Sequence, residues 1–157
     1  MSIDETRVLF QSTIPFNADR IRAAAVYCSD GRFGDQCDEL MHVALGLPRY
    51  DRLAVPGGAA CLAGHFATYR EEEGVAEQLR FLVRVHELER VVLIAHEHCG
   101  FYAERLNVSP LQLESQQRED IRKAVWKVRT ISRNIEIDAF LARKRWDGSI
   151  QFETVEV

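Results

Sequence analysis

Five consecutive apolar residues, Val91–Ala95 (VVLIA), limit the folds that are open to this chain. A run this short and this uniformly apolar is typical of a strand covered on both faces, as strands of parallel sheets are. The segment before it, Gly74–Glu89, has the period of an amphipathic helix, because Val75, Leu79, Leu82 and Val83 recur on one face. A helix that leads into a buried strand predicts a right-handed βαβ crossover.

Two earlier segments read as partner strands. Arg22–Cys28 (RAAAVYC) is apolar and ends in polar, Gly-containing sequence, and Arg52–Val55 is stopped by Pro56-Gly57-Gly58. Between them, Asp38–Leu45 reads as a short helix closed by Gly46. We therefore expect three parallel strands at the centre of the fold.

The C-terminal half predicts one more helix and a hairpin. Ser109, Pro110 and Gln112 form a capping-box signature, which places a helix start near Pro110. The tail, Ile135–Val157, alternates apolar and polar residues around Asp147-Gly148, a strong hairpin signal. The expected fold is a single α/β domain over residues 1–157, with a central mostly parallel sheet, flanking helices and a C-terminal hairpin that extends the sheet.

Size and charge narrow the class of protein. A chain of 157 residues and 18.0 kDa suits one domain, and a net charge of −4 gives no electrostatic drive toward nucleic acid or anionic membranes. No apolar run is long enough to span a bilayer, and Asp4 and Glu5 argue against a secretory signal. We therefore expect a cytoplasmic protein whose cysteines, at positions 28, 37, 61 and 99, are free thiols or metal ligands.

Two loops carry the candidate metal-binding and catalytic residues. Cys28-Ser29-Asp30-Gly31-Arg32 follows the first strand, and His96-Glu97-His98-Cys99-Gly100 follows Val91–Ala95. If both strands belong to one parallel sheet, both loops leave its carboxyl edge, where open α/β sheets form ligand crevices. Cys28 alone would read as a small apolar residue at a strand end, but Cys28, His96 and Cys99 together form a normal zinc set. Three protein ligands leave one position open for water, as in catalytic sites.

Asp30 and Arg32 flank Gly31 just after Cys28. Asp30 is placed either to ligate the metal itself or to accept a hydrogen bond from a metal-bound water. Arg32 would hold Asp30 ionised, since a nearby positive charge lowers the pKa of a carboxylate. A surface ion pair, worth ~0–1 kcal/mol, is the simpler explanation. We favour a functional dyad because both residues lie beside a proposed ligand.

Other candidate residues have structural explanations. His98 reads as a ligand, a proton shuttle or an exposed loop histidine, and we favour the last. The Glu71–Glu73 run is expected to be a solvated first helical turn. Packing or structural roles are expected for the remaining candidates, Cys37, Cys61, His42, His65 and His86.

The two loops resemble those of the β-class carbonic anhydrases, which carry Cys-X-Asp-Ser-Arg after one strand and His-X-X-Cys-Gly after a later one. This chain has CSDGR at 28–32 and HEHCG at 96–100. Val55–Ala59 (VPGGA) occupies the place of the family's Asn-Ala-Gly-Asn turn, and the C-terminal hairpin is similar to its last strand pair. Two departures stand out: Gly31 replaces a serine and Ala95 replaces a glycine.

The resemblance implies a carbonate dehydratase-type zinc lyase. Zn²⁺ would be held by Cys28, His96 and Cys99, and Asp30 and Arg32 would be the catalytic residues, with Asp30 a possible fourth ligand. The implied reaction is reversible hydration of carbon dioxide to bicarbonate by a zinc-bound hydroxide, in a homodimer or higher homo-oligomer with active sites near the subunit interface. Two alternatives stay open. One is a non-catalytic zinc-binding relative in which Asp30 excludes water, and the other is a hydrolase of a carbon dioxide analogue (COS or CS2).

Overall fold

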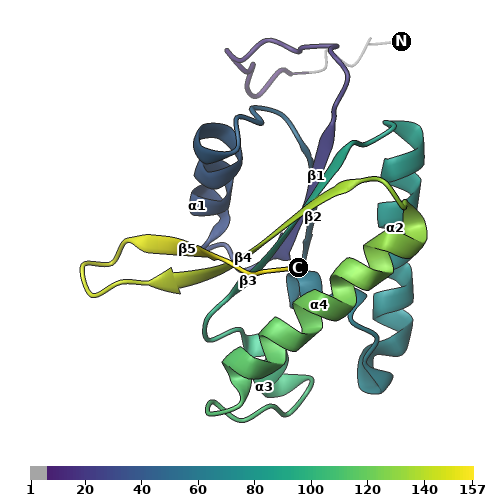
Figure 1. The fold of residues 1–157 in the computed structure, drawn as a ribbon. Coiled ribbons are helices and arrows are strands. Elements are labelled where there is room, and N and C mark those ends of the chain that lie inside the picture. The colour runs from purple at the N-terminus through teal and green to yellow at the C-terminus, as the bar shows by residue number, and fades with distance from the viewer. Residues whose placement is uncertain (1–6) are drawn as a thin grey trace, which may run out of the picture.

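Five strands form one sheet in the order β2-β1-β3-β4-β5 (Figure 1). The computed structural model describes residues 7–157, so Asp4 and Glu5 lie outside the described residues. The strands span Ala23–Cys28 (β1), Asp51–Val55 (β2), Arg90–His96 (β3), Glu136–Lys144 (β4) and Ile150–Thr154 (β5). Strands β2, β1, β3 and β4 run parallel, and β5 pairs antiparallel with β4. The expected mostly parallel sheet with a hairpin extension is confirmed, with the first hairpin strand serving as a fourth parallel strand.

Helices cover both faces of this sheet (Figure 1). The two long helices, α2 (Tyr69–Val85) and α4 (Leu113–Ile131), pack on one face, and the short α1 (Gly34–Glu39) packs on the other. Alternate residues of a strand point to opposite faces. In β1, therefore, Val26 faces the long helices while Ala25 faces α1. Burial on both sides explains why β1 and the Val91–Ala95 part of β3 are apolar without interruption.

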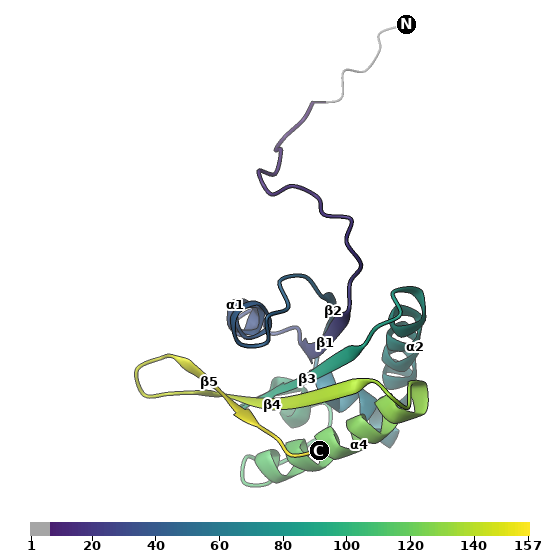
Figure 2. The ribbon, with the colours of Figure 1, turned by 45° about the horizontal axis from the view of Figure 1, so that its top comes forward.

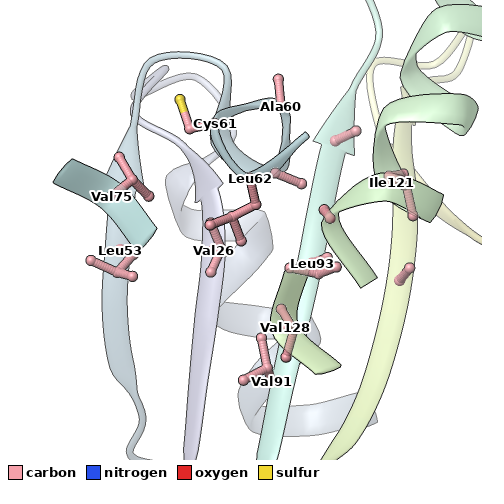
Figure 3. Packing of buried hydrophobic residues seen from close by; sticks show 14 of the residues in the cluster. Val26, Leu53, Ala60, Cys61, Leu62, Val75, Val91, Leu93, Ile121 and Val128 are labelled. Carbon is pink, nitrogen blue, oxygen red and sulfur yellow. The ribbon is translucent and has the colours of Figure 1, made fainter. Parts of the chain in front are cut away.

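The larger core lies between the sheet and the long helices (Figure 3). Val75 of α2 and Val128 of α4 belong to the same cluster as Leu93 of β3, which is fully buried. Burying an aliphatic side chain of this size contributes about 1.5–3 kcal/mol relative to leaving it exposed. This packing holds the ends of β1 and β3, and with them the two loops, in fixed positions.

The N-terminal segment lies apart from this core. Residues 7–20 are exposed, and Figure 2 shows the segment running away from the sheet before it enters β1. In the part of the chain from residue 7 onward, no helix combines the length and apolar character that a membrane crossing requires.

Two helices begin earlier than the periodicity suggested. Helix α2 starts at Tyr69 rather than Gly74, because the acidic run Glu71–Glu73 forms its first turn. Helix α1 starts at Gly34 and continues as a π-helical turn over Leu40–Ala44, which extends the expected helix toward its N-terminus. Hydrophobic periodicity misses such starts because first turns are rich in polar residues.

The predicted capping box at Ser109 is wrong. Helix α4 begins at Leu113, with Gln112 at the N-cap position. The backbone N–H of Gln112 donates to the Ser109 carbonyl at 3.0 Å, and the Ser109 Oγ contacts the Gln112 side chain instead of a backbone N–H. Ser109–Gln112 is therefore a turn that precedes the helix.

The hairpin prediction is confirmed. Strands β4 and β5 pair antiparallel, and Gly148 between them has a φ of 86°, which few residues other than glycine adopt. The Asp147 carboxylate accepts hydrogen bonds from the backbone N–H and hydroxyl of Ser149 and closes the turn.

Replacing Gly58 with alanine is expected to destabilise the protein by about 2–4 kcal/mol. Gly58 has a φ of 53°, and a Cβ there would lie 2.6 Å from the backbone nitrogen of Cys28, which cannot move without shifting β1. Urea unfolding followed by circular dichroism measures the loss. The control is Gly74→Ala in α2, where a Cβ meets nothing within 4 Å. An equal effect of both substitutions would contradict the close approach at Gly58.

Candidate metal centre

The two loops meet at the carboxyl edge of the sheet. Strands β1 and β3 are parallel neighbours, with Val26 opposite Leu93, so their following residues leave the same edge. There the ligand-type atoms of Cys28, His96 and Cys99 all lie within 4.8 Å of one another, and the two sulfurs are 4.0 Å apart. His96 and Cys99 are buried and Cys28 is half-buried. The structure thus brings together the three residues that the sequence singled out as metal ligands.

The His96 imidazole is oriented as a ligand. Its Nδ1 lies 2.7 Å from the Glu97 carbonyl oxygen, which can only accept, so Nδ1 carries the hydrogen and Nε2 keeps its lone pair. Nε2 is buried and has no hydrogen-bond partner within residues 7–157. Phe33 stacks on the ring at 4.2 Å between centroids and fixes its plane. A buried, unpartnered ring nitrogen beside two sulfurs is what a metal ion would satisfy.

Backbone N–H groups stabilise negative charge on the sulfurs. The adjacent Cys99 thiol lowers the pKa of Cys28 most, against the opposing effect of burial, and the backbone N–H groups of Asp30 and Gly57 lower this pKa further. The adjacent Cys28 sulfur and burial raise the pKa of Cys99. Zinc prefers thiolate and imidazole ligands, and its binding releases protons from thiols that are protonated before the metal binds. The donor set therefore fits Zn²⁺.

Asp30 and Arg32 form a bidentate ion pair. Arg32 Nε lies 2.9 Å from Asp30 Oδ1, and Arg32 Nη2 lies 2.6 Å from Oδ2. The Arg32 backbone N–H also donates to Oδ1 at 3.0 Å. These hydrogen bonds hold the pKa of Asp30 far below its ordinary range. The carboxylate is therefore ionised, and Asp30 is not among the ligand-type atoms that cluster within 4.8 Å.

The other candidates lie outside this cluster. His98 is exposed at the loop tip with a φ of 53°. Cys37 and Cys61 are buried in the two cores, and burial raises the pKa of each thiol to about 12. All four cysteines are free. His86 follows the last residue of α2, and its Nδ1 lies 2.6 Å from an Asp51 carboxylate oxygen on the edge strand β2. This pair connects the end of α2 to the sheet.

His65 belongs to a buried ionic cluster that the sequence did not reveal. Its Nε2 lies 2.9 Å from Asp120 of α4, and its Nδ1 lies 3.3 Å from Glu72 of α2. Hydrogen bonds to Asp120 and Glu72 raise the pKa of His65 to about 9. Glu72 was expected to be solvated, but it is buried because it accepts hydrogen bonds from the backbone N–H groups of Gly64 and His65 and from the Thr68 hydroxyl. The cluster ties the turn after β2 to both long helices.

Two further residues, Gln117 and Phe33, contact His96, and the sequence analysis did not identify either of them. Gln117 of α4, only 2% exposed, donates from Nε2 to the His96 carbonyl oxygen at 2.7 Å. Phe33 follows the dyad arginine directly. Gln117 lies one turn before Ile121 on the buried, otherwise apolar face of α4. A polar residue on a buried helix face is the sequence signal that would have pointed to Gln117.

Sequence relatives with curated records are uncharacterized proteins. One from Rickettsia conorii is 27% identical over 95 residues, and one from Rickettsia bellii is 24% identical over 107 residues. The matches cover 60% and 68% of this chain, and they span 49% and 64% of the relatives' own lengths. These relatives therefore carry no information about activity.

Solved structures with a similar fold are β-carbonic anhydrases. Isoform I from Trichomonas vaginalis superposes with a TM-score of 0.59 at 15% identity, covering 93% of this chain and 90% of its own. The β-carbonic anhydrase CcaA gives a TM-score of 0.54 at 12% identity, covering 88% and 79%. At these identities the likeness establishes the shared fold.

A family model described as "Putative carbonic anhydrase" matches residues 18–153, which include both loops, the whole of strands β1 to β4 and most of β5. A match over most of the chain, joined to the shared fold, assigns the family. The chain belongs to this carbonic anhydrase family.

Proposed function

We propose that this protein binds one Zn²⁺ through Cys28, His96 and Cys99 and catalyses the reversible hydration of carbon dioxide to bicarbonate. The observation that carries the proposal is the buried Nε2 of His96, which has no partner in residues 7–157 and faces two sulfurs within 4.8 Å. Family membership supports the reaction class. Zinc, when bound, supplies a Lewis acid that lowers the pKa of a water ligand toward about 7.

The surrounding residues have distinct tasks in this proposal. Phe33 and Gln117 fix the position of His96 through ring stacking and a hydrogen bond to its carbonyl. Asp30, kept ionised and oriented by Arg32, accepts a hydrogen bond at the open side of the site. Arg32, which is largely exposed, acts through Asp30.

Stopped-flow measurement of carbon dioxide hydration by the zinc-loaded protein tests the activity. The rate is expected to exceed the buffer rate and to rise between about pH 6 and 9, as the ionisation of a water ligand requires. Carbonyl sulfide and carbon disulfide are assayed in parallel as alternative substrates. A zinc-loaded protein that never exceeds the buffer rate with any of the three would leave the non-catalytic zinc-binding role in place.

We also propose that the protein acts as a cytoplasmic homodimer or larger homo-oligomer. In the described chain, β2 and β5 are edge strands of the sheet, and a partner can cover such edges. Light scattering at micromolar concentration is expected to report at least twice the chain mass of 18.0 kDa. A mass of one chain under these conditions would rule out an active site built at a subunit interface.

A further inference from the structure

A pocket of about 220 Å³ lies between the two long helices, α2 and α4, and the turn that follows β2 (Figure 1). Residues 28–32 and 96–100, which hold the candidate metal ligands and the ion pair beside them, do not line this pocket. It is therefore a second site, and its occupant need not be a substrate or a product of the proposed reaction.

The inner surface of this pocket is apolar. Cys61 and Leu62, which follow β2 and are labelled in Figure 3, are both buried. The Cys61 thiol is uncharged at neutral pH because burial raises its pKa to about 12, and its Sγ donates to the Pro56 carbonyl oxygen at 3.1 Å. On the outer side, the Trp126 side chain of α4 lines the pocket and is 70% exposed. An exposed indole beside an apolar wall offers a planar ring a surface on which to stack.

One positive charge in the lining has no partner. Lys127 of α4 lies 3.7 Å from Glu73 of α2, so these two groups pair with each other. The buried Glu72 is held by His65 and by backbone N–H groups of the turn after β2. Lys123 lines the same pocket and takes part in no ion pair among residues 7–157. Because the carboxylates of the lining are already engaged, the free charge that an occupant meets is positive.

These features together select one class of ligand. An inorganic anion would pair with Lys123 but would leave the Trp126 ring and Leu62 without an apolar contact. A neutral ring would fill the apolar part and leave the lysine charge unused, and an organic amine would be repelled by that charge. We propose that this pocket binds a small aromatic carboxylate, whose ring stacks on Trp126 and whose acid group pairs with Lys123.

Amide NMR of the zinc-loaded protein, with benzoate as the probe, tests this site without turnover. Titration to millimolar concentrations is expected to shift the backbone signals of Ala63 and Gly64, which line the pocket, and the indole N–H signal of Trp126. The indole signal of Trp146, which lies between β4 and β5 and is 92% exposed, is the internal reference and stays in place. Signals of residues 96–100 report separately on any benzoate that binds at the metal.

Two matched ligands separate the two contacts. Benzamide keeps the ring but has no charge, and acetate keeps the charge but has no ring. Because benzoate makes both contacts, it is expected to bind roughly tenfold more tightly than either of them.

Two variants test the assigned residues. Lys123→Gln is expected to weaken benzoate roughly tenfold and leave benzamide unchanged, and Trp126→Ala is expected to weaken both roughly tenfold. Both side chains are exposed, so the variants should fold like the wild type. Arg122→Gln is the control for the lysine variant, because it removes a positive charge from the preceding position of α4, where Arg122 pairs with Glu119 outside the pocket. Trp146→Ala is the control for the tryptophan variant, and both controls keep the wild-type affinities.

The inference is overturned if benzoate leaves the Ala63 and Gly64 signals in place, if benzamide or acetate binds as tightly as benzoate, or if Lys123→Gln behaves like Arg122→Gln. Preferential binding of benzoate that both pocket variants weaken, and that both controls keep, supports it. Neither result depends on whether the protein hydrates carbon dioxide, because the pocket and the candidate metal ligands share no residue.

Discussion

Purified protein is expected to contain about one zinc ion per chain, and the double variant Cys28→Ser/Cys99→Ser is expected to retain roughly a tenth of it or less. The two sulfurs lie 4.0 Å apart and supply two of the three donors that cluster within 4.8 Å. A serine hydroxyl stays protonated at neutral pH and is a poor zinc ligand. Removing both sulfurs leaves only His96, which cannot hold the ion alone.

Inductively coupled plasma mass spectrometry measures the zinc content. The matched control is Cys37→Ser/Cys61→Ser, which removes the same number of thiols from buried positions outside the cluster. This control is expected to keep its zinc, even if its stability falls. Circular dichroism establishes that each variant is folded. Full zinc occupancy in folded Cys28→Ser/Cys99→Ser protein would refute the assignment of the ligands.

Arg32→Ala is expected to lower carbon dioxide hydration by roughly a hundredfold or more while leaving the zinc content unchanged. Arg32 makes every side-chain hydrogen bond that the Asp30 carboxylate receives within the described residues, and it also donates its backbone N–H. Without the guanidinium, the pKa of Asp30 rises toward its ordinary value and the carboxylate is free to turn toward the cluster. The group would then be lost as a positioned acceptor and would block the open side of the site.

Stopped-flow assays and zinc analysis on the same samples distinguish a loss of activity from a loss of zinc. Arg32→Lys keeps the charge but cannot reproduce the two parallel hydrogen bonds, so it is expected to recover only part of the activity. Arg32 is 82% exposed, so neither variant should lose much folding stability. Wild-type activity in zinc-loaded Arg32→Ala would show that the ion pair is an ordinary surface contact.

The sheet was predictable because its strands are buried on both faces. Uniformly apolar runs at Ala23–Cys28 and Val91–Ala95 leave few alternatives to a parallel arrangement, and the Asp147-Gly148 turn fixes the hairpin. The helix starts were less predictable. The first turn of α2 is acidic, so its hydrophobic periodicity begins only after the helix has started. For α4, the Ser109–Gln112 segment resembles a capping box but forms a turn before the helix, which begins at Leu113.

By itself, the sequence determined which side chains are candidates for chemistry and which edge of the sheet they share. The spacing of His96 and Cys99, and the position of Cys28 at a strand end, follow from local sequence and parallel topology. Only the tertiary structure decided the surroundings of these groups. Three contacts join segments far apart in the chain. They are the stacking of Phe33 on His96, the hydrogen bond from Gln117 to the His96 carbonyl, and the ionic cluster of His65. Contacts of this kind depend on how helices and loops pack against the sheet in three dimensions, and no local pattern of residues encodes that packing.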